Sequence, residues 1–512
     1  MLTASALLVK IIGLLYRIPM LSYLGTEGMG YFNTAYELYA LFCVIATAGL
    51  PVAMSVLISA AEADPQKEGK ARRIFRIAFR AFVVIGGIGT LLLYGFSEGL
   101  AALFKNSGAA AGMRMIAPTV LLICISSAFR GYFQGKRSMT PTAVSQVIEA
   151  LGKLVLGLIF AAAARERGCD LPTTAACAVL GLTVGTGLSV VYLWIHQAVV
   201  NRGSSNAAEL ISDRRSDRII LKQLVMTAVP VTLGAAVMSI TKVLDLALIL
   251  RRLQATGLDE ATANAMYGCY STLVLPLFHM LPTLTTSVSL PTVPALSAAL
   301  GQGGEEGLAQ GRKITTSALR MTLLLSIPAA VGLAVFSEDV LTLLFGAQPT
   351  AVRTAAPWLS CIALSVPMSC LITVSGAILQ GGGHAARPVI SLLWGTAVKA
   401  VLAYFLLGLP GVGMMGAPIS TLVCDSIIVI MNFRFITHLL PGILPSGKEF
   451  LKLIAFPSIF GGGAVILVRH ARGWLGWQEI TTLRTIATVA AVMCVYGAAV
   501  LLNAGRKRNH TR

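Results

Sequence analysis

Long runs of apolar residues alternate with short polar segments along almost the whole chain. A membrane-spanning helix needs about 20 apolar residues, and about fourteen runs meet that requirement. Runs of this length favour a helix bundle, because barrel strands would be only about ten residues long and would alternate in polarity. The pattern predicts an all-α integral membrane protein. The runs fall at residues 2–24, 33–60, 74–104, 112–133, 139–164, 172–200, 219–250, 265–300, 314–346, 355–380, 387–408, 412–440, 450–469 and 482–503.

Composition agrees with this pattern. The chain has 512 residues, of which 56% are hydrophobic and 12% are charged, whereas soluble domains have about 25% charged residues. The net charge of +18 would be compatible with nucleic-acid binding. However, the Lys and Arg residues lie mostly in short loops between apolar runs, so no nucleic-acid partner is expected. The nine cysteines include no C-x-x-C pair, which favours packing over a metal site.

The basic residues also predict topology. Loops after even-numbered runs, together with the C-terminal tail, hold about twice as many Lys and Arg residues as the other loops, and by the positive-inside rule they face the cytoplasm. Both termini are therefore expected to be cytoplasmic. The first apolar run continues beyond the length of a signal peptide and lacks an A-x-A cleavage site, so no cleavable signal is expected.

An internal duplication divides the chain. The polar segment 201–222 follows the sixth run, and three blocks of matching residues recur in the same order on either side of it. Each copy has six runs, an even number, which predicts two lobes related by an axis along the membrane normal. We expect an N-terminal lobe at 1–200, a cytoplasmic linker at 201–218, a C-terminal lobe at 219–440 and an appendage at 441–512. The matches include Lys10 with Lys242, Pro51 with Pro291, Phe96-Ser97-Glu98 with Phe336-Ser337-Glu338, and Lys153 with Lys399.

Two cations lie within the first apolar run. Lys10 and Arg17 are seven residues apart, which places them within about 20° of each other around a helix. A charge at bilayer depth costs roughly 2.5–3.5 kcal/mol, so this face is expected to line a cavity that holds an anion. Lys242 matches Lys10 in the second copy, which predicts an anion site between the lobes. Arg17 is matched by Ile249, so the site should be weighted toward the first lobe.

Further ionisable residues within the apolar runs are candidates for function. Glu149 and Lys153 are four residues apart, and Lys242 and Asp245 are three apart, so each pair can meet on one helix face. Such pairs could neutralise each other or line a cavity, and both interpretations stay open. Lys399 has no carboxylate at such a spacing on its own helix. The full set is Lys10, Arg17, Glu37, Glu149, Lys153, Lys242, Asp245, Lys399 and Asp425.

The eighth run is rich in proline. Each proline removes a backbone hydrogen bond and can kink the helix, and in a transporter such breaks can act as hinges. A bent but passive helix is the other interpretation. The candidate hinge residues are Pro51, Pro282, Pro291 and Pro294.

Signatures of soluble enzymes are absent from the sequence. There is no H-E-x-x-H motif, no Walker motif and no His/Cys cluster with metal-binding spacing, and no loop is long enough for a catalytic domain. We therefore expect no catalytic residue, metal or cofactor, and no enzymatic activity. Energy for transport would come from a Na⁺ or H⁺ gradient, the membrane potential or the gradient of the substrate.

Five short motifs, spread over most of the chain, form a recognisable set. They are Lys10-x-x-Gly13-Leu-Leu-Tyr16-Arg17-Ile18-Pro19, Leu24-Gly25-x-Glu27-Gly28-x-Gly30-Tyr31, Arg251-Arg252-Leu253-Gln254, Val293-Pro294-x-Leu296-Ser297 and Ala377-Ile378-Leu379-Gln380-Gly381. In these motifs the chain resembles the stage V sporulation protein B family of polysaccharide-biosynthesis proteins. That family belongs to the multidrug/oligosaccharidyl-lipid/polysaccharide (MOP) exporter superfamily and is related to lipid II flippases.

The resemblance implies two six-helix lobes around a central cavity, two C-terminal helices that form a groove for a lipid tail, and alternating access. It also implies a substrate linked to undecaprenyl pyrophosphate, in the cytoplasmic membrane of a bacterium. Lipid II flippases place arginines in the early spans. Here one of the two cations in the first run is Lys10, and the second run offers Glu37.

We therefore predict a flippase for a lipid-linked cell-wall precursor, whose partners are this glycan lipid, membrane lipids and cell-wall synthesis enzymes. The expected head-group ligands are Lys10, Arg17, Lys153, Lys242 and Lys399. Charge balance or ion coupling is expected of Glu37, Glu149, Asp245 and Asp425. The alternatives are a cation-coupled multidrug exporter of the same superfamily, a membrane-embedded glycan polymerase, and a scaffold for wall-synthesis enzymes.

Overall fold

The computed structural model describes residues 2–62, 70–202 and 214–474, together with residues 487, 490, 491 and 496. Within this described part every regular element is a helix and none is a strand. Contacts divide the chain into two compact units, Met1–Gly268 and Cys269–Arg512. The all-α class expected from the hydrophobic pattern is confirmed.

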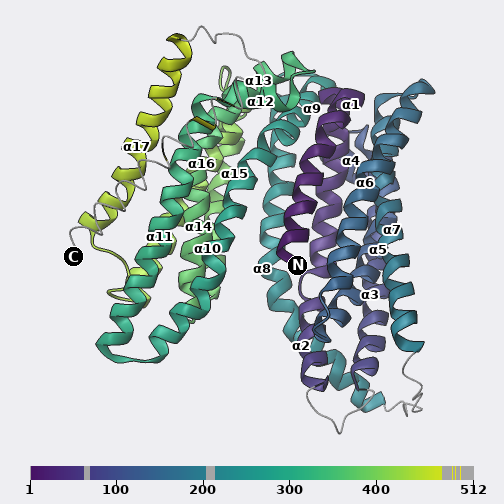
Figure 1. Cartoon of the computed structure of the whole chain (residues 1–512). Coiled ribbons are helices and arrows are strands. Elements are labelled where there is room, and N and C mark those ends of the chain that lie inside the picture. The colour runs from purple at the N-terminus through teal and green to yellow at the C-terminus, as the bar shows by residue number, and fades with distance from the viewer. Residues whose placement is uncertain are drawn as a thin grey trace. The chain divides into compact units, whose positions relative to one another are not determined.

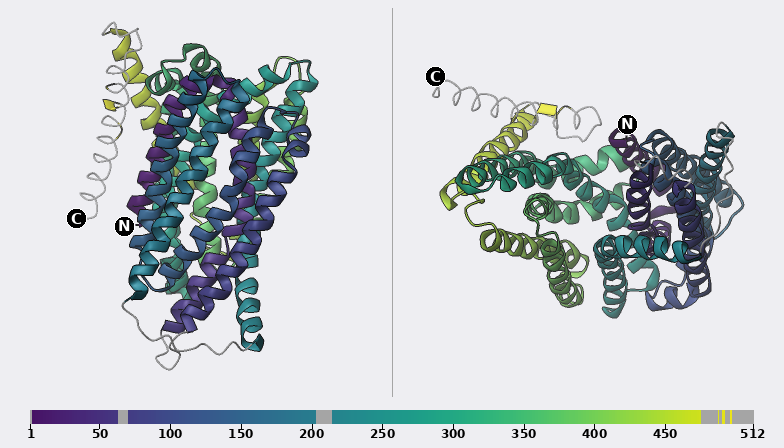
Figure 2. Two further views of the ribbon diagram at one scale, coloured as in Figure 1. Left: turned by 90° about the vertical axis from the view of Figure 1, so that its right-hand side faces the viewer. Right: turned by 90° about the horizontal axis from the view of Figure 1, so that it is seen from below.

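The first unit contains long helices that run side by side (Figures 1 and 2). Its largest packing surfaces join α6 to α7 and α5 to both α7 and α3. Its helices are α1 (Leu2–Thr47), α2 (Leu50–Glu62), α3 (Lys70–Gly95), α4 (Ser97–Leu103), α5 (Ala109–Gly135), α6 (Thr140–Glu166), α7 (Leu171–Arg202), α8 (Arg214–Ala255) and α9 (Glu260–Cys269), the last of which ends at the boundary between the units.

The second unit begins with a π-helical turn at Tyr270–Val274, and α10 packs against both α11 and α14. A short 3₁₀ turn, Gly413–Met415, precedes α16. The remaining helices are α10 (Leu275–Gly301), α11 (Gly304–Val335), α12 (Ser337–Phe345), α13 (Pro349–Ala363), α14 (Val366–Gly381), α15 (Ala386–Leu406), α16 (Gly416–Leu439) and α17 (Gly447–Trp474).

The described residues contain eleven helices that are long and apolar enough to cross a membrane, or twelve if the bent pair α13 and α14 forms one span. The expected count of about fourteen is not confirmed. Two differences account for the gap between fourteen expected spans and the twelve counted when the bent pair is one span. The first two predicted runs are counted as one stretch, Ile11–Glu62, and the last run, 482–503, lies almost entirely outside the described residues.

The helix α1 is a hairpin rather than one straight span. Gly25 has φ 63° and ψ −176°, which interrupts the helical backbone. The rings of Tyr16 and Phe32 lie 5.9 Å apart between centroids, although sixteen residues of continuous helix would separate them by about 24 Å. The chain therefore reverses at Gly25, which is where the first apolar run was predicted to end.

Replacing Gly25 by alanine is expected to destabilise the protein by roughly 1–3 kcal/mol, because its backbone conformation is almost exclusive to glycine. A Cβ at Gly25 would meet no atom within 4 Å, so backbone strain is the whole effect. Gly87→Ala in α3 is a matched control, since its Cβ also meets open space and its φ is ordinary. Unfolding measured in mixed micelles should show a lower free energy of unfolding for Gly25→Ala and not for Gly87→Ala. Equal stability of the two variants would contradict the strained turn.

A buried polar network holds α9 against the turn of α1. The Asn106 side-chain amide donates to Thr34 Oγ1 and to Asn264 Oδ1, both at 2.9 Å. Asn264 in turn donates to the backbone carbonyl of Glu27 at 2.8 Å. Gly30 faces Asn264 so closely that a Cβ there would lie 2.4 Å from its carbonyl oxygen. These contacts fix the geometry of the hairpin.

Glycines also bring α6 and α7 into direct backbone contact. A Cβ on Gly152 would lie 2.5 Å from the Cα of Gly185, and a Cβ on Gly181 would lie 2.2 Å from the amide nitrogen of Gly157. Small residues at such positions let transmembrane helices approach closely. Lys153 follows Gly152 directly, so this packing fixes the position of Lys153 along α6.

Candidate functional site

Lys153 is the centre of an aromatic cluster in the first unit. Its Nζ lies 4.4 Å from the centroid of the Tyr36 ring, 5.1 Å from that of Tyr16 and 5.8 Å from that of Phe32. All three rings come from the α1 hairpin, whereas Lys153 comes from α6. The faces of aromatic rings attract a cation, and more strongly where water is scarce. This cluster, called the Lys153 cage below, places the amino group of Lys153 beside three aromatic rings within a membrane helix.

An ion pair between helices lies one turn from the cage. Arg130 on α5 contacts Glu149 on α6 at 2.8 Å, and the two side chains are 11% and 20% exposed. Arg130 Nε also donates to Ser145 Oγ at 2.9 Å, and that hydroxyl donates to the carbonyl of Thr142 at 2.8 Å. The Arg130 guanidinium is therefore oriented by a further bond besides the ion pair.

The cage and the ion pair open onto one cavity of about 400 Å³. Four helices contribute to it: α1, α5, α6 and α7. Its volume falls in the usual range of roughly 300–1,000 Å³ for small-molecule sites. Its walls are apolar near the start of α1 and polar along α6. The lining residues are Val9, Ile12, Gly13, Tyr16, Tyr36, Arg130, Gln146, Glu149, Ala150, Lys153 and Leu182.

Other charged residues of the first unit extend this arrangement. The charges of Arg17, Glu149 and Glu37 act on Lys153. Glu37 also interacts electrostatically with Lys242 and with Asp245 on α8. Among the described residues, the charged side chains that interact around Lys153 are four cations and three carboxylates. Their formal charges therefore sum to +1. The cations are Arg17, Arg130, Lys153 and Lys242, and the carboxylates are Glu37, Glu149 and Asp245.

Most of the predicted site residues thus fall in one unit. Arg17 and Glu37 lie on the two arms of the α1 hairpin, and the side chain of Lys10 is outside the described residues. The sequence assigns Lys242 to the second lobe, whereas contacts place α8 in the first unit together with Arg17. The lobe boundaries and the site assignments stay predictions.

Two predicted residues lie in the second unit. Lys399 on α15 and Asp425 on α16 are both 9% exposed, and these helices pack against each other extensively. Asp425 accepts a hydrogen bond from Ser365 at 2.6 Å and another from Ser369. The carboxylate therefore accepts hydrogen bonds from two hydroxyls at the start of α14.

The prolines occupy two kinds of position. Pro51 is the second residue of α2, where a missing N–H costs little. Pro282, Pro291 and Pro294 lie inside α10, which continues across all three. Their role as hinges stays a prediction.

Arg130 is not among the site residues expected from the sequence. Its partner Glu149 lies nineteen positions further along the chain, beyond any spacing on a single helix. The Lys153 cage was also missed, although Phe32 and Tyr36 are one turn apart and stack with their ring planes at 8°. That spacing was an available signal for an aromatic face.

The chain belongs to the polysaccharide biosynthesis protein family, whose model matches residues 1–299. Residues 271–405, in the second half of the chain, match the MatE family. The family resemblance expected from the sequence motifs is confirmed.

Two curated relatives come from Bacillus subtilis (strain 168). Stage V sporulation protein B is 24% identical over 443 residues, which cover 86% of this chain and 83% of that protein. Lipid II flippase MurJ is 26% identical over 535 aligned residues, covering 98% and 93% of the two chains. The solved structure of "Lipid II flippase MurJ, inward closed conformation" has a TM-score of 0.73 at 16% identity and covers 100% of this chain and 99% of that one. This likeness shows the fold.

Proposed function

We propose that this protein is a flippase that moves an undecaprenyl-pyrophosphate-linked cell-wall precursor from the inner to the outer leaflet of the cytoplasmic membrane. The observation that carries the proposal is the cavity of about 400 Å³ lined by Lys153 and Arg130. A diphosphate suits such a site, because arginine can form forked hydrogen bonds to it and lysine can act as a point charge. The lipid II flippase among the relatives supports a substrate of this chemistry.

Glu149 would provide Arg130 with a partner whenever the substrate does not occupy the cavity. Glu149 accepts a hydrogen bond from Arg130. A diphosphate that entered the cavity would compete with Glu149 for the Arg130 guanidinium. Release of the substrate would restore the Arg130–Glu149 ion pair. The cavity could then return to the cytoplasmic side of the membrane without leaving the Arg130 guanidinium unpaired. Coupling to Na⁺, H⁺ or the membrane potential would act through Glu37, Asp245 or Asp425.

Alternating access would expose this cavity to each side of the membrane in turn. With both termini in the cytoplasm, as the basic loops predict, the precursor would enter from the cytoplasmic leaflet. Cell-wall synthesis enzymes on the two sides would supply the substrate and consume the product. Lys10 and Arg17 would bind the head group, together with Lys242 and Lys399 during the cycle.

A cation-coupled multidrug exporter is the second candidate, and the MatE match to residues 271–405 favours it. Such a protein would attract cationic substrates through carboxylates. The first unit instead has a positive excess around Lys153, which favours an anion. Transport of a cationic dye that the anionic precursor does not inhibit would support the exporter.

The proposal is tested in cells that depend on this protein for wall growth. Labelled lipid-linked precursor should reach the outer leaflet with the wild-type protein and should fail to do so, by roughly tenfold or more, with Arg17→Ala or Lys10→Ala, each of which removes a charged contact worth about 1.5–3 kcal/mol. Arg114→Ala is the control, because this arginine pairs with Glu98 at an exposed site. Normal delivery by well-expressed Arg17 and Lys10 variants would reject the head-group role of these two residues. Failure of the wild-type protein would reject the function.

A further inference from the structure

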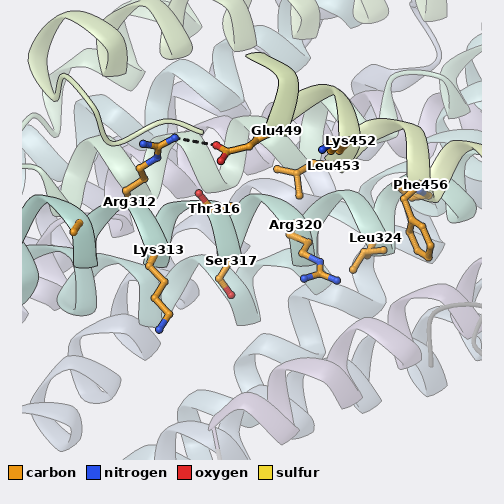
Figure 3. A pocket seen from close by; sticks show the side chains of 12 residues that line it. Arg312, Lys313, Thr316, Ser317, Arg320, Leu324, Glu449, Lys452, Leu453 and Phe456 are labelled. Carbon is orange, nitrogen blue, oxygen red and sulfur yellow. Dashed lines mark hydrogen bonds and ion pairs between the residues drawn. The ribbon is translucent and has the colours of Figure 1, made fainter. Parts of the chain in front are cut away.

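A second cavity of about 550 Å³ lies between α11 and α17, entirely within the second unit (Figure 3). It shares no residue with the cavity at Lys153, so the two sites are separate. Its walls combine cations, hydroxyls and apolar side chains. The lining residues are Ala309, Arg312, Lys313, Thr316, Ser317, Arg320 and Leu324 of α11, and Glu449, Lys452, Leu453, Phe456 and Pro457 of α17.

The single carboxylate of this groove is already engaged. Arg312 contacts Glu449 at 2.9 Å across the groove, and these side chains are 45% and 55% exposed. The same Oε2 atom accepts a hydrogen bond from the backbone N–H of Ser446 at 2.9 Å, which caps the start of α17. Figure 3 shows Arg312 and Glu449 facing each other between the two helices. Glu449 is therefore committed to Arg312 and to the cap.

Three cations of the groove remain. Among the residues that the structure describes, none of Lys313, Arg320 and Lys452 forms an ion pair with a carboxylate. Figure 3 places Lys313 and Arg320 along one stretch of α11, with Ser317 between them. Hydroxyls and cations at this spacing can together bind the oxygens of a phosphate.

The groove changes from polar to apolar along both helices in the same direction. On α11 it runs from Arg312 to Leu324, a rise of about 18 Å. On α17 it runs from Glu449 to Phe456. The two helices are parallel, because they meet at the Arg312–Glu449 pair and again where a Cβ on Gly461 would lie 3.2 Å from Pro328. The groove therefore matches an amphiphile with an anionic head and an apolar tail.

Tyr496, near the C-terminus, lies beside the apolar end of the groove. Tyr496 donates a hydrogen bond to the carbonyl of Leu324 at 2.8 Å. Phe456 stacks near Phe460, with ring centroids 4.5 Å apart. These contacts give the deeper part of the groove an apolar wall suited to an acyl chain.

We propose that this groove binds one anionic phospholipid of the membrane, with its phosphate among Lys313, Arg320 and Lys452 and its acyl chains against Leu453 and Phe456. Basic pockets between transmembrane helices favour the head groups of anionic lipids. Lys313, Arg320 and Lys452 lie near the starts of the apolar runs 314–346 and 450–469, at the end of the membrane that the basic loops predict to be cytoplasmic. Anionic lipids create a negative surface there. This phospholipid is not the transported substrate.

The test uses the purified full-length protein in detergent, titrated with dioleoyl phosphatidylglycerol or dioleoyl phosphatidylcholine and measured by native mass spectrometry. Phosphatidylglycerol should bind about tenfold more tightly or better, because each cation adds to the attraction. The triple variant Lys313→Gln/Arg320→Gln/Lys452→Gln should lower its affinity to that of phosphatidylcholine. Equal binding of the two lipids, or wild-type binding by the triple variant, would overturn the proposal.

A matched control removes three exposed cations elsewhere, as Arg137→Gln/Arg218→Gln/Lys222→Gln, and should bind phosphatidylglycerol as the wild type does. If it loses affinity equally, net charge explains the binding and the proposal fails. If the triple variant of the groove is unstable, the single Lys452→Gln variant should still show a partial loss, and an unchanged affinity would count against the site.

Competition identifies the occupant. Inorganic phosphate should not displace phosphatidylglycerol at equal concentration, because it makes no contact with the apolar end. Displacement by phosphate would reduce the groove to an anion site and would overturn the lipid assignment. Displacement by undecaprenyl pyrophosphate at lower concentration than phosphatidylglycerol would assign the groove to the transported lipid and would also overturn it. Neither result depends on a transport assay.

Discussion

Replacing Lys153 by methionine is expected to slow delivery of the lipid-linked precursor to the outer leaflet by roughly tenfold or more. Methionine has a similar length and packs well against aromatic rings, so the Lys153 cage should keep its shape while the cavity loses its charge. A hydrogen bond to a charged group contributes about 1.5–3 kcal/mol. Loss of that interaction with the diphosphate sets the size of the effect. The measurement is the initial transport rate in proteoliposomes.

Stability separates this functional role from a structural one. Among the described residues Lys153 forms no ion pair, and burying a charge without a paired partner is costly, so Lys153→Met should unfold no more readily than the wild type. Lys136→Met is a matched control, since the Lys136 Nζ also lies over a tyrosine ring, 5.1 Å from the centroid of Tyr132. Its side chain is 33% exposed at the end of α5, and transport should be unchanged. A wild-type rate for Lys153→Met would show that transport does not use this charge.

Loss of either partner of the Arg130–Glu149 pair is expected to destabilise the protein by roughly 2–4 kcal/mol. Breaking a fully buried pair costs about 3–5 kcal/mol, and here the side chains are 11% and 20% exposed, which lowers the cost. Arg130→Met leaves Glu149 without its guanidinium, and Glu149→Gln leaves the charge of Arg130 uncompensated. The double variant should be more stable than the sum of the single effects by roughly 1–3 kcal/mol. Unfolding of all four proteins in mixed micelles measures this coupling.

The exposed pair Arg114–Glu98 provides the comparison. Its side chains are 43% and 76% exposed, and exposed pairs contribute only about 0.2–1 kcal/mol. A double-variant cycle on this pair should therefore give a coupling well below that of Arg130 and Glu149. Similar couplings for the two pairs would mean that burial does not strengthen the pair at the cavity.

Much of the fold followed from the hydrophobic pattern, because transmembrane helices must satisfy their backbone hydrogen bonds internally and must be apolar over a fixed length. The end of the first run at Leu24 coincides with the reversal at Gly25. The break at Gly49 inside the second run was not predicted. A Cβ there would lie 2.0 Å from the carbonyl oxygen of Ala228 on α8, and such an approach between distant segments leaves no periodic signal.

The site was predicted in part, for a related reason. Spacing on one helix identifies residues that share a face, so Glu149 and Lys153 were correctly placed together. It does not identify what lies opposite that face. Glu149 is held by Arg130 on α5, and Lys153 lies over the rings of the α1 hairpin. Both partners depend on how helices pack, which sequence spacing alone does not encode.

Reconstitution in liposomes would show whether this chain moves an anionic lipid-linked glycan. The purified protein in liposomes is given an undecaprenyl-pyrophosphate-linked disaccharide, or the same lipid with an uncharged linkage in place of the pyrophosphate. Appearance of the sugar on the opposite leaflet is measured with a membrane-impermeant lectin. The pyrophosphate lipid should move in a protein-dependent manner, and the uncharged lipid should move little. Equal movement of both lipids, or movement of neither above that in protein-free vesicles, would show that the protein is not a flippase for anionic lipid-linked glycans.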